Sequence, residues 1–376
     1  MHRVVFVAAI CLLIAPAGAV KATTYLVLPD GSGDFPTIQA AIDGVGEGDV
    51  IELGDGTFQG TGNHDVYFNK DIVLRSAGDN PDLCIIDCEG DAETYQRGIS
   101  IAGGTPNSAV IRGIKIINGH MDIMGGGLRC GGSPTIENCV FAGNHTDSWG
   151  GGGVYCEHEG ASFFDCRFEE NTAGSGGGAY VTQGASVRFE RCVFQGNSSG
   201  GCAVMILDSA WFIDCTFLEN GGSGGALDVW DVTNTEIRNC SFVGNTSTQS
   251  GALVLAQLTS WILVNTILAF NDTPLPVSAQ QVGAMSVSCC DVFGNEGGDW
   301  VGCLEGLEGT AGNISADPLF CDREAADLHL AFDSPCAPEA DPGCGLIGAL
   351  PVGCGISPVE QTSWGKTKAA FRGAGR

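Results

Sequence analysis

The amino-acid sequence predicts an all-β fold: a single-stranded right-handed parallel β-helix, or solenoid, of about ten rungs. Three observations predict it: a motif that returns about every 25 residues, a bend residue inside each copy, and short apolar runs separated by Gly, Asn and Asp. Glycine accounts for 58 of 376 residues, and 44% of the residues are apolar. The chain therefore has tight-turn residues and enough apolar residues to fill a core.

The motif consists of an apolar residue, any residue, Asn or Asp, Cys, any residue, Phe, two further residues and Asn. Its clearest copy runs from Ile136 to Asn144. Eight copies, some degenerate, start at positions 111, 136, 163, 189, 212, 237, 262 and 287, in steps of 23–27 residues. A propeller blade needs about 40 residues, and nothing within the period has the pattern of an amphipathic helix. The period therefore favours a β-solenoid.

Each copy contains a bend, because its apolar residues fall at i, i+3 and i+5. A continuous strand would place them at i, i+2 and i+4. The additional residue is of a type that adopts left-handed backbone at low energetic cost. In different copies it is Gly113, Asn138, Asp165, Asp214 or Asn239. We expect two short strands joined by this bend in every rung.

Stacked rungs lie about 4.8 Å apart, so each motif position should form a ladder along the solenoid. The cysteines should be mostly free thiols that fill the interior, because directly stacked Cβ atoms are too far apart for a relaxed disulfide. The asparagines should share amide hydrogen bonds along the stack. The ladders are Cys139, Cys166, Cys192, Cys215 and Cys240; Phe141, Phe168, Phe194, Phe217 and Phe242; and Asn144, Asn171, Asn197, Asn220 and Asn245.

A glycine pair and a small or apolar residue follow most copies, as in residues 125–128 and 151–154, and predict a second corner. The order Phe-x-x-Asn and then Gly-Gly-small resembles the polymorphic outer membrane protein repeat, over about residues 111–295. That resemblance implies β-helix rungs on a secreted or surface-displayed protein, and some members of that family are adhesins.

Both ends of the solenoid should be capped, because open strand edges invite polymerisation. Residues 20–48 are expected to form the N-terminal cap, with a short amphipathic helix that begins at Pro36 and Thr37. This opening resembles that of pectin-lyase-like β-helices. The repeats should then occupy residues 49–300, and residues 50–53 should open the first rung. The apolar face of the helix is Ile38, Ala41, Ile42 and Val45.

Residues 301–354 are expected to form an irregular C-terminal cap. Their cysteines lack ladder spacing, so disulfides are expected among them, with the pairing left open. These cysteines are Cys303, Cys321, Cys336, Cys344 and Cys354. Residues 355–376 form a basic tail with no acidic residue after Glu360, and we expect a flexible tail or a sorting element.

Residues 1–19 have the pattern of a secretory signal peptide, which predicts a secreted or cell-surface protein. No later segment is long and apolar enough to span a bilayer. The formal net charge is −27, which argues against nucleic acid or anionic membranes as partners. We expect a monomer without a cofactor, although the acidic surface is compatible with Ca²⁺. The partner is expected to be a polysaccharide or a cell-surface glycan.

Two His-x-Asp segments lie one rung apart and should stack side by side, and aromatic and acidic residues follow them. Aromatic rings can bind sugars, and imidazoles and carboxylates can bind a cation or, in a polysaccharide-active enzyme, do acid–base chemistry. The alternative is a set of solvated polar loops produced by the repeat. No residue is assigned to catalysis or as a metal ligand. The candidate ligand-binding residues are His120, Asp122, His145, Asp147, Trp149, Tyr155, Glu157 and Tyr180.

The sequence thus favours a non-catalytic β-helix protein that binds glycans or surfaces. The alternative is a polysaccharide-active enzyme, a lyase or glycoside hydrolase of the pectin-lyase-like fold. The motifs of pectin methylesterases and polygalacturonases are absent from the chain. A lyase would need converging bases, and Lys115 and Arg167 lie two rungs apart, so we expect them not to meet.

Overall fold

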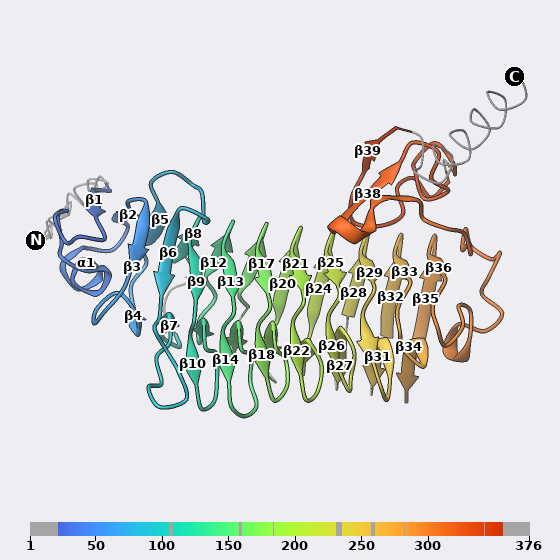
Figure 1. Cartoon of the computed structure of the whole chain (residues 1–376), viewed down its shortest axis with the longest axis horizontal. Coiled ribbons are helices and arrows are strands. Elements are labelled where there is room, and N and C mark those ends of the chain that lie inside the picture. The colour runs from blue at the N-terminus through green and yellow to red at the C-terminus, as the bar shows by residue number, and fades with distance from the viewer. Residues whose placement is uncertain are drawn as a thin grey trace, which may run out of the picture.

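The computed structural model describes residues 22–355, except 105–107, 158–159, 183, 231–234, 257–259, 282 and 342. It confirms the all-β right-handed parallel β-helix, which runs the length of the molecule in Figure 1. The solenoid has about 13 turns, so the expected ten is too low. The expected number is too low because turns near the N-terminus lack the motif with Cys and Phe from which the rungs were predicted. The expected signal peptide and all but the first residue of the basic tail lie outside the described residues.

The first sheet has 11 parallel strands and contains the first apolar residue of each motif. Its strands are β1 (Thr24–Val27), β2 (Val50–Leu53), β5 (Val73–Ser76), β8 (Val110–Arg112), β12 (Thr135–Glu137), β16 (Ser162–Phe164), β20 (Val187–Glu190), β24 (Ala210–Ile213), β28 (Thr235–Arg238), β32 (Ser260–Val264) and β35 (Ala284–Ser288).

The second sheet follows the bend and has ten parallel strands that contain the phenylalanine ladder. Its strands are β3 (Gly56–Phe58), β6 (Cys84–Asp87), β9 (Lys115–Ile117), β13 (Val140–Ala142), β17 (Arg167–Glu169), β21 (Val193–Gln195), β25 (Thr216–Leu218), β29 (Ser241–Val243), β33 (Ile267–Ala269) and β36 (Asp291–Phe293).

The third sheet has six strands of two residues each, directly after the ladder position, and was not anticipated. Its strands are β10 (His120–Met121), β14 (His145–Thr146), β18 (Thr172–Ala173), β22 (Ser198–Ser199), β26 (Gly221–Gly222) and β30 (Thr246–Ser247). The fourth sheet follows the Gly-rich corner and has nine strands. They are β4 (Val66–Phe68), β7 (Ile99–Ile101), β11 (Leu128–Cys130), β15 (Val154–Cys156), β19 (Ala179–Val181), β23 (Val204–Ile206), β27 (Leu227–Trp230), β31 (Gly251–Ala256) and β34 (Leu275–Gln280).

The bend between the first two sheets is formed by one left-handed residue per turn, as predicted. Gly113 has φ 69°, Asn138 has φ 47° and Asp165 has φ 55°. One position of the repeat was wrong. Leu263, and not Ile262, pairs with Ile237 and is fully buried, and a slip of one residue moves a side chain to the opposite face of a strand.

The asparagine ladder is confirmed, and it lies entirely in the interior. Asn197 is typical of it: its Oδ1 accepts hydrogen bonds from the backbone N–H and from the Nδ2 of Asn171, at 3.1 and 3.0 Å. Its Nδ2 donates to the carbonyl of Phe168 at 2.7 Å and to Oδ1 of Asn220 at 3.0 Å. Each amide therefore bonds to the turn before it and to the turn after it, and so links three consecutive turns.

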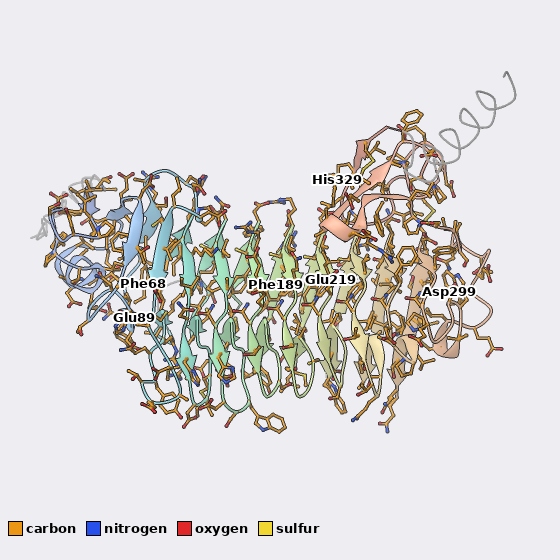
Figure 2. The ribbon with its side chains drawn as sticks, in the orientation of Figure 1. Phe68, Glu89, Phe189, Glu219, Asp299 and His329 are labelled. Atoms are coloured by element: carbon orange, nitrogen blue, oxygen red, sulfur yellow. A yellow bond between two sulfur atoms is a disulfide. The ribbon has the colours of Figure 1, made fainter. Side chains whose placement is uncertain are left out.

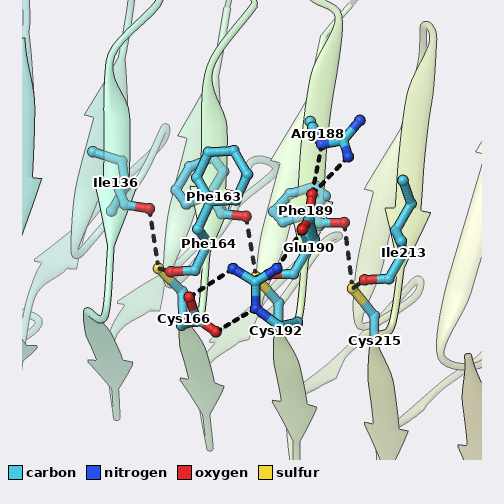
Figure 3. Close-up of polar contacts among 12 residues, drawn as sticks. Ile136, Phe163, Phe164, Cys166, Arg188, Phe189, Glu190, Cys192, Ile213 and Cys215 are labelled. Atoms are coloured by element: carbon cyan, nitrogen blue, oxygen red, sulfur yellow. Dashed lines mark hydrogen bonds and ion pairs between the residues drawn. The ribbon is translucent and has the colours of Figure 1, made fainter. Parts of the chain in front are cut away.

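The cysteine ladder consists of buried free thiols, as expected. Each thiol donates to a carbonyl of the preceding turn, as from Cys166 to Ile136 and from Cys192 to Phe163, both at 3.5 Å (Figure 3). The phenylalanine ladder stacks face to face, with ring centroids 4.4–5.4 Å apart from Phe141 to Phe242. Figure 2 shows Phe68 and Phe189, both fully buried, between the walls of the tube.

The N-terminal cap contains the expected helix, α1 (Ile38–Gly44). The Thr37 side chain accepts a hydrogen bond from the N–H of Ala40 at 3.2 Å, and Ile38, Ala41 and Ile42 are buried. The expectation that residues 50–53 open the first rung was wrong, because β1 pairs with β2 in the same parallel sheet. The first sheet therefore begins at β1, before any recognisable motif in the sequence.

The C-terminal cap contains the 3₁₀-helices η1 (Gly302–Leu304) and η2 (Arg323–Ala325), and a small sheet of β37 (Phe320–Asp322), β38 (Asp327–Ala331) and β39 (Val352–Cys354). It folds back over the outer face of the second sheet, where Leu328 and Leu330 pack with Leu218, Val243 and Ile267 (Figure 1).

Two disulfides stabilise this cap. They join Cys321 to Cys354 and Cys289 to Cys344. Cys289 was not among the expected partners, because it occupies a bend position of the repeat, with φ 52°. Cys303 and Cys336 are free thiols.

Candidate functional site

The two His-x-Asp segments stack as the sequence predicted. His120 begins β10 and His145 begins β14, and the two residues pair in register. Their rings lie 4.5 Å apart, centroid to centroid, in an edge-to-face arrangement. Both residues directly follow the position of the asparagine ladder, so the buried ladder holds the backbone that presents them.

Asp147 joins the two imidazoles through one carboxylate oxygen. Its Oδ1 lies 2.8 Å from Nε2 of His120 and 3.2 Å from Nε2 of His145. Its Oδ2 accepts a hydrogen bond of 2.9 Å from the Tyr95 hydroxyl. The hydrogen bonds from His120, and then from Tyr95, lower the pKa of Asp147. The carboxylate is therefore ionised and placed between its partners.

The cluster is accessible to solvent to different degrees. Trp149 is 71% exposed and Tyr95 is 47% exposed. The side chains of His145 and Asp147 are 39% and 38% exposed, whereas that of His120 is 14% exposed. We call Tyr95, His120, His145 and Asp147, which contact one another, together with Trp149, which follows Asp147 by two residues, the loop cluster. It offers a carboxylate, two imidazoles and a phenol ring in contact, with an exposed indole nearby in the chain.

Asp122 lies at the edge of this cluster. It is exposed, and its carbonyl accepts a hydrogen bond of 3.0 Å from the N–H of Ser148. The pKa of Tyr95 is raised, chiefly by the hydrogen bond to Asp147 and by the negative charge of Asp147, with a smaller contribution from the charge of Asp122. Asp122 is therefore close enough to act electrostatically on the Tyr95 hydroxyl.

The other predicted residues lie elsewhere. Tyr155 and Tyr180 stack with centroids 5.7 Å apart, but they are only 7% and 8% exposed. A Cβ on Gly150 would come within 3.0 Å of the Tyr155 ring, so the backbone of this loop covers the tyrosine. Glu157 is engaged by Arg129, whose Nε donates to it at 2.8 Å. These three residues support the loops and do not join the loop cluster.

Two residues that contact the histidines and Asp147 were not indicated by the sequence. Tyr95 comes from the segment between β6 and β7, 52 residues before its partner Asp147, and no repeat position marks it. Thr172 follows ladder residue Asn171 as His145 follows Asn144, and its Oγ1 lies 2.5 Å from Nδ1 of His145. The in-register position after each ladder asparagine would have identified Thr172.

The expectation that Lys115 and Arg167 do not converge was wrong, because both contact the carboxylate of Asp82 in a second polar cluster. Although they lie two turns apart, Lys115 Nζ is 3.6 Å from Asp82, and Arg167 Nη2 is 2.9 Å from the same carboxylate. Arg167 also pairs with Glu169 at 3.3 Å. The loop that contains Asp82 reaches over β9 to make this contact, which the spacing of the repeat did not show.

Beside this cluster is a surface pocket of about 440 Å³. It is lined mainly by polar and acidic side chains along the second sheet. The lining residues are Lys115, Ala142, Glu169, Glu170, Gln195, Gly196 and Glu219.

Comparison with known proteins gives likenesses of low identity. A metabotropic glutamate receptor-like protein P from Dictyostelium discoideum is 27% identical over 153 residues, and this chain spans about 10% of its length. The pectate lyase Pel9A is similar in structure with a TM-score of 0.48 and 15% identity, over 89% of this chain and 98% of that one. A pectin methylesterase from Aspergillus niger is similar in structure with a TM-score of 0.40 and 15% identity, over 81% of this chain and 91% of that one.

A family model provides stronger evidence. The model described as right handed beta helix region matches residues 57–205 and 126–303, which together make up more than half of the chain. These residues include most of the turns described above, among them all five members of each predicted ladder. The chain therefore belongs to the right-handed β-helix family.

Proposed function

We propose that this chain is a non-catalytic extracellular β-helix protein that binds a glycan at the loop cluster. One observation supports this most: Tyr95, 47% exposed, contacts an ionised carboxylate that is shared by two imidazoles, and Trp149, 71% exposed, follows that carboxylate by two residues in the chain. Sugar rings stack their apolar faces on aromatic side chains, and their hydroxyls bond to carboxylates and imidazoles. The loop cluster provides both kinds of contact.

The charge of the chain restricts the class of glycan. At a net charge of −27, a polyuronate would be repelled unless a cation bridged it. A neutral or amine-bearing glycan is therefore the better partner. The two disulfides of the C-terminal cap support an extracellular location, because disulfides persist in oxidising compartments. Among the described residues, none of the helices is long and apolar enough to cross a bilayer.

The test is a binding screen of the purified protein against neutral, amine-bearing and uronate polysaccharides, by affinity electrophoresis and then calorimetry. We expect binding to a neutral or amine-bearing glycan, weakened at least about fivefold by Trp149→Ala, since an exposed stacking aromatic contributes about 1–3 kcal/mol. Phe332→Ala is the matched control, because Phe332 is 66% exposed on the C-terminal cap, away from the loop cluster. Equal loss in both variants, or none in either, would contradict the proposal.

A second function, a polysaccharide-active enzyme, is favoured by the convergence of Lys115 and Arg167 on Asp82 beside the pocket. A lyase needs a base for the α-proton and a cation to neutralise the uronate carboxylate. Asp82 and Glu169 already partner the two cations here, and for this reason binding is proposed first. Release of unsaturated or reducing ends that Arg167→Ala abolishes and Arg188→Ala preserves would establish the enzyme instead.

A further inference from the structure

We propose that His120, His145 and Asp147 bind one divalent transition-metal ion, with Zn²⁺ as the model ion. The ligand atoms would be the two Nε2 atoms and Oδ1 of Asp147. This inference concerns metal alone and does not depend on glycan binding. The sequence suggested a sugar or ion site at these residues and assigned no metal ligand, so the ligand atoms and the class of ion come from the structure.

The spacing of the ligand atoms fits a first coordination shell. The three atoms all lie within 4.8 Å of one another. Bonds of about 2.0–2.2 Å at angles between 90° and tetrahedral would place ligand atoms about 2.9–3.5 Å apart. Oδ1 of Asp147 already lies 2.8 and 3.2 Å from the two imidazole nitrogens. Small outward rotations of the side chains would therefore admit the ion.

Neighbouring groups orient these ligands, as the outer shell of a metal site does. Thr172 Oγ1 lies 2.5 Å from Nδ1 of His145. If this nitrogen carries the proton, Nε2 has its lone pair directed toward Asp147. The Tyr95 hydroxyl donates to Oδ2 of Asp147 at 2.9 Å and leaves Oδ1 for the ion.

The donor set determines the class of ion. Two imidazoles and one carboxylate suit Zn²⁺, Ni²⁺ or Cu²⁺, whereas Ca²⁺ takes six to eight oxygen ligands. Three protein ligands leave a fourth position for water or a bound molecule. The other described histidine–carboxylate pairs, His64 with Asp65 and His329 with Asp327, are not part of any described group of three such ligands.

The experiment titrates the purified, metal-stripped full chain with ZnCl₂ and separately with CaCl₂ by calorimetry, without glycan. We expect one equivalent of Zn²⁺ to bind, and much weaker Ca²⁺ binding. His120→Ala and His145→Ala should each weaken Zn²⁺ binding by roughly 100-fold, and Tyr95→Phe by about tenfold. His329→Ala, which removes an imidazole from a simple ion pair, should bind Zn²⁺ as the wild type does.

A spectrum with Co²⁺ provides an independent readout. Co²⁺ at this site should give d–d bands without a thiolate charge-transfer band, since the ladder thiols are buried. Trp149→Ala should leave Zn²⁺ binding unchanged, so a failure of the glycan proposal is distinguishable from a failure of this one. Absence of Zn²⁺ binding, undiminished binding by His120→Ala/His145→Ala, or a thiolate band would each overturn the metal site.

Discussion

Two columns of residues run side by side along this solenoid, one position apart in the sequence. The ladder column is asparagine in every turn from Asn144 to Asn295, and all its members are buried. The column that directly follows it forms the third sheet and is partly exposed. Its members in sequence order are His120, His145, Thr172, Ser198, Gly221 and Thr246.

The contrast shows which column the fold requires to be one residue type and which column it allows to vary. In the ladder, each amide bonds to the turn before it and the turn after it, so another side chain would leave buried polar groups without partners. In the outer column, the backbone ladder holds the strands, and the side chain varies from turn to turn, although His145 and Thr172 also bond to each other. Histidines occupy two successive turns of that column, where Tyr95 and Asp147 also reach them.

The largest effect should come from the interior of the tube. Phe194→Ala removes a fully buried ring that stacks on Phe168 and Phe217, at 4.5 and 4.9 Å. We expect the free energy of unfolding to fall by about 4 kcal/mol, because truncating a buried Phe leaves a cavity. Phe332→Ala, on an exposed ring, should change it by less than about 0.5 kcal/mol. Denaturant titrations of both variants make the comparison, and equal effects would contradict it.

The two columns can be compared directly at neighbouring residues. Asn197→Ala removes four side-chain hydrogen bonds. It leaves the buried backbone N–H of Asn171 without its partner, and it takes one bond each from Asn171 Nδ2, the Phe168 carbonyl and Asn220 Oδ1. We expect a loss of about 3 kcal/mol in the free energy of unfolding. Ser198→Ala, one residue along in the exposed column, should change it by less than about 0.5 kcal/mol. A large effect of Ser198→Ala would show that the outer column is also structural.

The interior of the fold was predictable from sequence because stacking repeats the same demand in every turn. Gly113, Asn138 and Asp165 revealed the bend, and the spaced cysteines revealed a thiol ladder. Of the first two strands, β2 was expected and β1 was not, because an apolar strand such as β1 pairs through backbone groups that leave no specific residue pattern.

The candidate site was predictable only in part. The period of the repeat brought His120 and His145 together, since both occupy the same column. It gave no information on Tyr95 or Asp82, because both reach their partners from segments between strands that do not follow the repeat. Tyr155 and Tyr180 were expected at the surface, but a neighbouring loop covers the first of them.

A smaller effect should follow from a carboxyl group buried in the second sheet, beneath the C-terminal cap. Asp291 is fully buried, and desolvation raises its pKa to about 7, although Oδ1 accepts the N–H of Ala316. A raised pKa in the folded state means that the folded protein binds the proton more tightly. Stability should therefore be greatest below about pH 4 with respect to this group, fall as the pH rises to about 7, and then level off.

Asp291→Asn should remove this contribution to the pH dependence and raise the thermal midpoint at pH 8. We expect the change to be smaller than in the two preceding comparisons, because local opening of the C-terminal cap can hydrate the carboxylate. Asp43→Asn, an exposed residue of α1 at the opposite end of the solenoid, is the control substitution and should not raise the thermal midpoint at pH 8. If Asp291→Asn does not alter the pH dependence of stability, a group other than Asp291 causes it.

The most direct test of this account compares Asn144→Ala with His145→Ala, two adjacent residues on opposite sides of the same wall. Unfolding and Zn²⁺ binding are measured on both variants. The account predicts that Asn144→Ala lowers the free energy of unfolding by about 3 kcal/mol, whereas His145→Ala keeps it within about 1 kcal/mol and weakens Zn²⁺ binding by roughly 100-fold. An equal loss of stability in both variants, with Zn²⁺ binding retained by His145→Ala, would contradict it.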